Sequence, residues 1–136
     1  MNTHSPRIVT VIVADDSALI RGRLCALLET EPAVRVVGEA SSACETMSQF
    51  ERYRPDAVVL DIQMPDGSGV EVLRRIKQSA PWCVVIMLTQ FRERAFREMS
   101  LILGANHFLN KASEFEQVPE ILRELSQSPA HISFDP

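Results

Sequence analysis

Short apolar runs alternate with helix-length stretches of mixed polarity five times along the chain. The runs cover Arg7–Ala14, Val34–Ala40, Asp56–Leu60, Cys83–Leu88 and Asn106–Leu109. The longer runs are nearly continuous in Val, Ile and Leu, which is the pattern of strands buried on both faces of a sheet. We therefore predict five strands, each leading into a helix.

The stretches between the runs carry apolar residues at the three- and four-residue spacing of an amphipathic helix. They predict helices over residues 17–30, over residues 42–53, and from the turn at residues 65–67 to residue 79. The final helix is predicted to begin near Val118, because Pro119 is tolerated in the first turn of a helix and breaks its middle. Residues 113–117 are predicted to form a turn.

The fourth helix follows the run that ends at Leu88. We expect one side of this helix to be buried, formed by Phe91, Ala95, Met99 and Ile102. Gly104 is expected to end it, because glycine readily adopts the left-handed conformation that closes helices.

Strict alternation of strand and helix favours a parallel sheet, because right-handed crossovers place the helices on both faces of it. We predict one doubly wound α/β domain over residues 7–127. Residues 1–6 form an N-terminal extension in this interpretation. Residues 128–136 show no periodicity, and we expect a flexible tail there, with a docking segment as the alternative.

Composition places the chain among ordinary globular domains. It has 136 residues, of which 46% are apolar and 24% charged, and its net charge is -4. No run of like charge resembles the basic footprint of a nucleic-acid binder, so we expect no contact with nucleic acid. The longest apolar run is too short to span a bilayer and no signal peptide is recognisable, so we expect a cytoplasmic protein without membrane contact.

The chain contains three cysteines, Cys25, Cys44 and Cys83. They lie far apart without the spacing of a zinc site, and their odd number argues against a disulfide framework. We expect reduced thiols, most of them buried.

Polar side chains follow four of the five predicted strands. Asp15 and Asp16 follow the first strand, Asp61 follows the third, Thr89 the fourth and Lys111 the fifth. Because parallel strands end at one edge of the sheet, ligands bind there. Each of these residues alone has a structural explanation, such as capping a helix or forming a turn. Their occurrence together predicts one crevice that holds three carboxylates, a hydroxyl and an ammonium.

Three carboxylates in one crevice repel each other and need a cation to stay ionised together at neutral pH. A site made only of oxygen ligands suits a hard ion, and we expect Mg²⁺. A carboxylate in such a site can attack a phosphoryl group and form an acyl phosphate. The cation, the lysine and the hydroxyl would then neutralise charge on the transferred oxygens.

These features together resemble the receiver domain of two-component response regulators. The resemblance covers residues 7–127 and rests on the acidic pair, the segment LDIQMPDGSG that begins one residue before Asp61, Thr89 after CVVIML, and Lys111 after GANHFLN. It implies a five-stranded sheet of flavodoxin-like order 2-1-3-4-5 with helices on both faces.

The resemblance also implies roles for the residues of the crevice. Asp61 is then the phosphoacceptor, and Thr89 and Lys111 contact the phosphoryl group. The implied ligands of Mg²⁺ are Asp16, Asp61, the backbone carbonyl of Gln63 and, at longer range, Asp15. Thr89 and Phe108 are the implied switch residues.

The implied function is that of a single-domain response regulator. A histidine kinase or a histidine phosphotransfer protein would donate the phosphoryl group, and the chain, rather than being an enzyme, would assist its own phosphorylation and dephosphorylation. It would signal to a downstream protein through the face of the fourth helix, fifth strand and fifth helix, with a phosphorylation-dependent homodimer as a further outcome. The alternative is a receiver fragment of a DNA-binding transcriptional regulator.

Two residues depart from the family pattern. Ala112 stands where proline usually follows the lysine, and we expect a trans peptide bond before it, because a cis bond without proline costs about 3 kcal/mol. Gln90 stands where a small residue usually follows the hydroxyl. We expect Gln90 at the rim of the crevice, where it restricts access to Asp61.

Three other interpretations fit the residues less well. An EF-hand that begins at Asp61 needs glycine at its sixth position, where Asp66 stands. An aspartyl-phosphate phosphatase of the haloacid dehalogenase type needs a second aspartate two residues after the nucleophile, where Gln63 stands. A flavin-binding domain of the same topology would need a loop that cradles phosphate, and none is recognisable.

Overall fold

The computed structural model describes residues 7–91 and 93–128. Within these residues, five strands form one sheet in the order β2-β1-β3-β6-β7, and every neighbouring pair is parallel. The strands are β1 (Val9–Ala14), β2 (Val34–Ala40), β3 (Ala57–Leu60), β6 (Val84–Thr89) and β7 (His107–Asn110). This arrangement confirms the predicted parallel sheet and its order 2-1-3-4-5.

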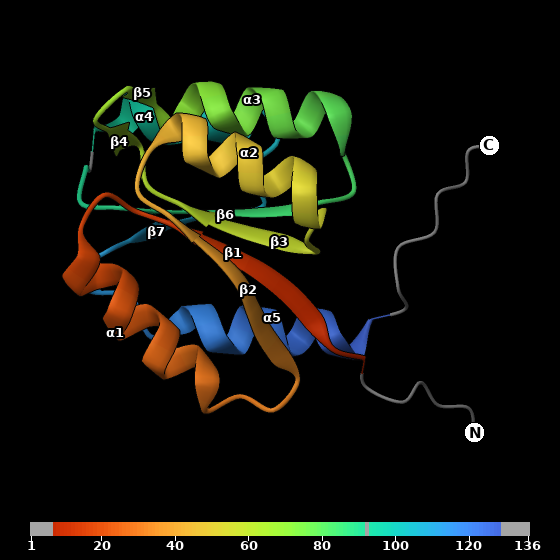
Figure 1. Cartoon of the computed structure of the whole chain (residues 1–136). Helices are drawn as coiled ribbons and strands as arrows, with labels where there is room; N and C mark the ends of the chain where they lie inside the picture. The colour runs from red at the N-terminus through yellow and green to blue at the C-terminus, as the bar shows by residue number, and fades with distance from the viewer. Residues whose placement is uncertain (1–6, 92, 129–136) are drawn as a thin grey trace.

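Helices cover both faces of the sheet, as predicted. They are α1 (Ala18–Glu29), α2 (Ala43–Tyr53), α3 (Gly69–Ser79), α4 (Arg94–Ile102) and α5 (Gln117–Gln127). Figure 1 shows α2, α3 and α4 on one face and α1 and α5 on the other. None of the helices described combines the length and apolar composition that crossing a bilayer requires.

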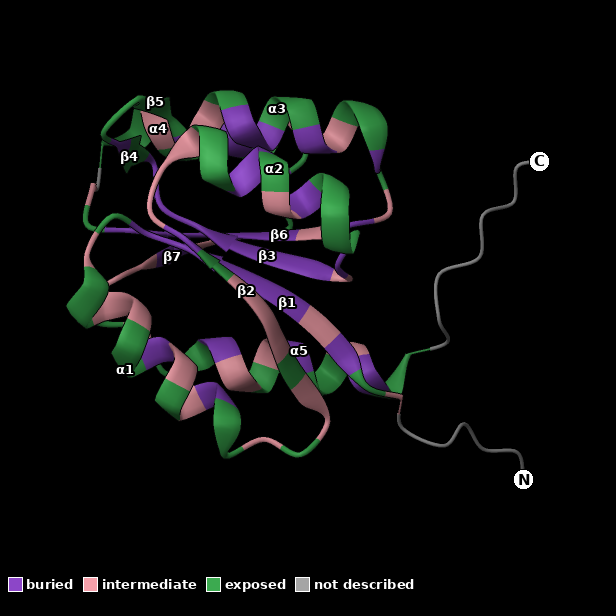
Figure 2. Ribbon diagram, viewed as in Figure 1, coloured by how far each residue is buried: buried purple, intermediate pink, exposed green. Residues whose placement is uncertain are grey.

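The core consists of two apolar layers separated by the sheet (Figure 2). Successive side chains of a strand point to opposite faces, so β1 serves both layers. Val11 and Val13 pack with the layer under α1 and α5. Ile12 and Ala14 pack with the layer under α2 and α3. Burial on both faces explains why these strands read as continuous apolar runs.

Serine side chains cap three of the helices. Ser17 accepts a hydrogen bond from the backbone of Ile20 in α1, and Ser42 and Ser68 do the same for α2 and α3. These bonds satisfy backbone N–H groups that have no partner within the helix. The caps fix where each helix leaves the sheet edge.

The predicted buried side of α4 is wrong within the helix, although Phe91, which precedes the helix, packs against the core as predicted. Ala95 is exposed, Met99 is 49% exposed and Ile102 is 79% exposed. The side that packs on the sheet carries Phe96, Ser100 and Leu103 instead. This set has the same helical spacing. Because it contains a serine, the pattern of apolar residues did not identify it as the buried side.

Other boundaries agree with the sequence to within a few residues. Gly104 ends α4 with a φ of 104°, as expected of a closing glycine. Pro119 lies in the first turn of α5. A small hairpin of β4 (Gln63–Met64) and β5 (Gly67–Ser68) follows β3 and was not predicted. The N-terminal extension at residues 1–6 and residues 129–136 of the expected tail lie outside the described residues.

Candidate functional site

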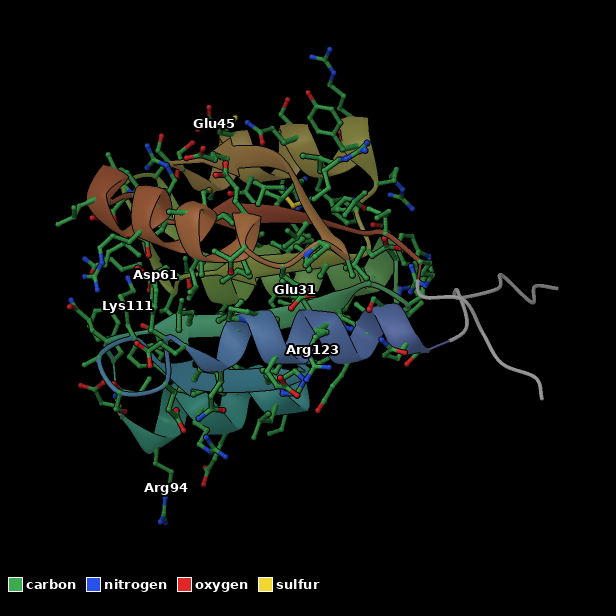
Figure 3. The ribbon with its side chains drawn as sticks, turned by 90° about the horizontal axis from the view of Figure 1, so that it is seen from below. Glu31, Glu45, Asp61, Arg94, Lys111 and Arg123 are labelled. Atoms are coloured by element: carbon green, nitrogen blue, oxygen red, sulfur yellow. The ribbon has the colours of Figure 1, made fainter. Side chains whose placement is uncertain are left out.

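The carboxyl ends of the central strands bring the predicted residues to one edge of the sheet. Asp15 follows β1 and Asp61 follows β3, while Lys111 follows β7, the last strand of the sheet. Figure 3 shows Asp61 and Lys111 side by side at this edge. A crevice of about 360 Å³ lies there, lined by Asp15, Asp16, Ser17, Ile20, Asp61, Gln63, Gln90, Phe91 and Lys111.

Lys111 bridges two carboxylates. Its Nζ donates to Asp15 Oδ2 at 2.6 Å and to Asp61 Oδ2 at 2.9 Å. The other oxygen of each carboxylate accepts a backbone N–H, from Ser17 at 2.8 Å and from Ile62 at 2.7 Å. Both carboxylates are buried, and these bonds hold them in fixed orientations.

Opposing effects act on the pKa of Lys111. Burial of the ammonium favours its neutral form, but hydrogen bonds and charge from Asp15 and Asp61 outweigh this and raise the pKa above its ordinary value. The side chain therefore stays protonated at neutral pH. One positive charge is thereby fixed among the carboxylates.

The acidic group fits a hard divalent cation. Carboxylate oxygens of Asp15, Asp16 and Asp61 lie within 4.8 Å of one another, and Asp16 is exposed to solvent. One ammonium among three carboxylates leaves two negative charges. An oxygen-only donor set with excess negative charge, open to water on one side, suits partly hydrated Mg²⁺.

Thr89 is not among the residues that line the crevice. The residue is fully buried, and its hydroxyl accepts the backbone N–H of Phe91 at 3.1 Å. Its carbonyl accepts the backbone N–H of Lys111 at 2.8 Å. Thr89 therefore connects the end of β6 to Lys111, the residue that follows β7.

Gln90 is exposed and lines the crevice, and its restriction of access to Asp61 stays a prediction. It also lines a neighbouring depression beside Ile20 and Lys111. The peptide bond between Lys111 and Ala112 is trans, as expected, since no cis bond occurs among the described residues.

Phe108 lines a smaller cavity, which shares Phe91 with the crevice. It is half-buried, and the guanidinium of Arg97 in α4 lies 5.9 Å from the centre of its ring. The cavity measures about 170 Å³ and is bounded also by Phe91, Asn110 and Glu114. Phe108 thus has space beside it and a cation over its ring.

Asp66 was not identified from the sequence as a site residue. Its two carboxylate oxygens accept the backbone N–H groups of Ala43 at 2.7 Å and Cys44 at 2.9 Å, at the start of α2. These bonds lower the pKa of Asp66. They tie the β4–β5 hairpin, which follows Asp61, to α2. The partners are over twenty residues apart, so local sequence patterns do not reveal the bond.

Gly69 is the other residue missed. A Cβ added there would lie 1.8 Å from the backbone oxygen of Asp61, and the N–H of Gly69 donates to the carbonyl of Ile62 at 2.5 Å. Only glycine permits this close approach of two backbones. The sequence of residues 65–67 predicted a turn before α3, but it did not predict this contact.

Comparison with known proteins identifies the family. The model of the response regulator receiver domain matches residues 11–123 of the chain. The chain belongs to the response regulator receiver domain family. Receiver domains are signalling switches that bind Mg²⁺ in an acidic pocket, and the group of Asp15, Asp16 and Asp61 fits that pocket.

The receiver domain matches parts of longer proteins. A protein-glutamate methylesterase/protein-glutamine glutaminase of Halalkalibacterium halodurans is 30% identical over 134 residues, which are 94% of this chain and 39% of that protein. The DNA-binding transcriptional activator DevR/DosR of Mycobacterium tuberculosis is 34% identical over 103 residues, 76% of this chain and 48% of that protein. The chain therefore spans less than half the length of these relatives.

A solved structure shows the same architecture. The response regulator domain of Thermotoga maritima CheB superposes with a TM-score of 0.77 at 33% identity. The match covers 88% of this chain and 94% of that one. The sheet order and the two helical layers are thus those of a receiver domain.

The cysteines of the receiver domain differ in exposure. Cys83 is buried, Cys25 is half-buried and Cys44 is exposed, so the expectation that most are buried is wrong. All three are free thiols. Burial raises the pKa of Cys25 to about 11 and that of Cys83 to about 12, which keeps both protonated at neutral pH.

The close contact at Gly69 predicts an asymmetry between two glycine substitutions. Gly69→Ala forces the backbone of Asp61 to move and is expected to lower the free energy of unfolding by about 1–3 kcal/mol. Gly22→Ala, in an open position of α1, is the control and is expected to raise it by roughly 0.5–1 kcal/mol. Urea denaturation measures both. Equal effects of the two substitutions would contradict the contact.

Proposed function

We propose that Asp61 accepts a phosphoryl group, with Mg²⁺ bound, from a phosphohistidine of a histidine kinase or a histidine phosphotransfer protein. The observation that carries this proposal is the bond from the Lys111 ammonium to Asp61, within a group of three carboxylates at an open crevice. A carboxylate held next to a fixed cation is oriented for attack before the donor arrives.

The proposed reaction transfers a phosphoryl group between two side chains. An oxygen of Asp61 forms a bond to phosphorus while the nitrogen–phosphorus bond of the phosphohistidine breaks, and the donor histidine leaves with the electron pair of that bond. Asp15, Asp16, Asp61 and the backbone carbonyl of Gln63 would hold Mg²⁺, which would supply positive charge for the phosphoryl oxygens. Lys111, which contacts Asp61, supplies a second positive charge. Water later attacks phosphorus, the bond from phosphorus to the Asp61 oxygen breaks, and inorganic phosphate leaves as the Asp61 carboxylate is restored.

The proposed donor docks beside the crevice. A depression of about 340 Å³ adjoins the crevice between α1 and the loop before α5, with Ile20 and Phe115 in its lining. Leu19, in the first turn of α1, is 70% exposed. This combination of apolar contacts next to a reactive carboxylate suits a helical partner that presents its histidine to Asp61.

The proposed readout lies on the face of α4, β7 and α5. Arg97 of α4 lies over the Phe108 ring of β7, so a movement of the ring alters the exposed side of α4. Arg94 points away from the body of the protein on this helix (Figure 3).

A separate downstream protein or a second copy of the chain would bind this face after phosphorylation. The alternative output is a linked DNA-binding domain, in line with the name of the mycobacterial relative.

Substitution of the carboxylates tests the phosphoacceptor. We expect Asp61→Asn to abolish labelling by a phosphohistidine donor at every Mg²⁺ concentration, because the nucleophile is lost. Asp16→Asn is the matched variant; it removes one anionic ligand and should shift labelling to higher Mg²⁺ concentrations. Full labelling of Asp61→Asn would reject the assignment, and an unchanged Mg²⁺ dependence of Asp16→Asn would reject its role as a ligand.

The position of Gln90 predicts an effect on access. Gln90→Ala should accelerate both labelling by phosphoramidate and loss of the phosphoryl group by about fivefold, equivalent to ~1 kcal/mol of barrier, because donor and water approach along similar lines. Gln78→Ala, on the exposed side of α3, serves as the control. Faster labelling combined with slower loss would show that the Gln90 amide orients water instead of obstructing it.

Amide hydrogen exchange tests the proposed face. On phosphorylation, exchange should change in α4, β7 and the start of α5, because Phe108 and Arg97 rearrange there. Peptides from α2 are the internal reference. Changes confined to α1 and α2 would exclude the face of α4, β7 and α5 as the readout.

A further inference from the structure

The loop after β7 folds back on the side chain of Asn110. The Oδ1 of Asn110 accepts the backbone N–H of Ala112 at 2.8 Å and that of Ser113 at 3.0 Å. An asparagine that bonds the backbone two residues ahead forms a tight turn. Lys111 is the residue enclosed by this turn.

Glu114 closes the same turn from the other end. Its carboxylate accepts the backbone N–H of Asn110 at 2.7 Å, and its own N–H donates to the carbonyl of Asn110 at 2.8 Å. Because β7 is the last strand of the sheet, one of its sides has no neighbouring strand. Glu114 thus gives the N–H of Asn110, at the end of this strand, an acceptor from outside the sheet.

The backbone of Lys111 is consequently held on both sides. Its N–H donates to the carbonyl of Thr89 at 2.8 Å, and the turn fixes the chain that follows. A lysine side chain has many rotamers, so its ammonium is placed accurately only where the backbone beneath it is fixed. The turn also requires a donor at position 112, which alanine has and proline lacks.

We infer that Asn110 and Glu114 are positioning residues that hold Lys111 against Asp15 and Asp61. The inference rests on the proposed function, in which the Lys111 ammonium contacts the phosphoryl group. The two residues act on the reaction only through Lys111. A small displacement of a charged group in such a site slows the reaction strongly.

The test compares Asn110 variants in two backgrounds. In the otherwise unchanged protein, Asn110→Ala should slow labelling by phosphoramidate at saturating Mg²⁺ by about tenfold, and Asn110→Asp, which keeps the acceptor oxygens, should recover most of the rate. In the Lys111→Ala background, Asn110→Ala should cause no further loss. Glu114→Ala and Glu114→Gln form a second pair with the same expectation.

The outcomes separate this inference from the proposed function. If Lys111→Ala slows labelling and Asn110→Ala adds the same loss in both backgrounds, the proposed role of Lys111 stands and the positioning role is rejected. If Lys111→Ala is labelled at the unchanged rate, the proposed role of Lys111 fails and the positioning role fails with it.

Amide exchange provides a readout that does not depend on phosphorylation. Measured by NMR without Mg²⁺ or donor, the amides of Ala112 and Ser113 should be protected and should lose that protection in Asn110→Ala. Ser113→Ala, which keeps the backbone donor, is the control. Unchanged protection in Asn110→Ala would overturn the inference.

Discussion

The bonds from one ammonium to two buried carboxylates organise this receiver domain. Lys111 reaches Asp15 and Asp61 only because β1, β3 and β7 run in parallel and end at one edge of the sheet. Without the ammonium, the buried carboxylates of Asp15 and Asp61 would repel each other. The order of the strands and the apolar layers on both faces serve to bring these three charges together.

The same arrangement is costly for stability and useful for chemistry. Removing charges from water carries a penalty that their mutual attraction repays only with good geometry, so buried ion pairs are weak evidence of stabilisation. Here each carboxylate keeps one oxygen bonded to backbone and the other to Lys111. The third carboxylate, Asp16, is exposed on the side open to water. The crevice is thus arranged to bind a cation and a phosphoryl group in addition to the lysine.

Most of the site was predictable because the strands of a parallel sheet end at one edge, and a polar residue after an apolar run marks each such end in the sequence. Asp15, Asp61 and Lys111 each follow an apolar run, and a parallel sheet necessarily gathers such positions. The buried side of α4 was not predictable, since two sets of residues share its helical spacing and the buried set contains Ser100. The Asp66 bond joins distant segments, and the space around Gly69 depends on how two backbones pack. Such contacts produce no regular spacing of residues by which the sequence could predict them.

The central claim is that the carboxylate of Asp61, one of the two bonded to Lys111, becomes an acyl phosphate. Incubation of the intact protein with phosphoramidate and Mg²⁺, reduction with borohydride and peptide mass spectrometry locate the modified residue, because reduction converts an aspartyl phosphate to homoserine. The account predicts homoserine at position 61 and only when Mg²⁺ is present. Homoserine at another position, or an unmodified position 61 under these conditions, would contradict it.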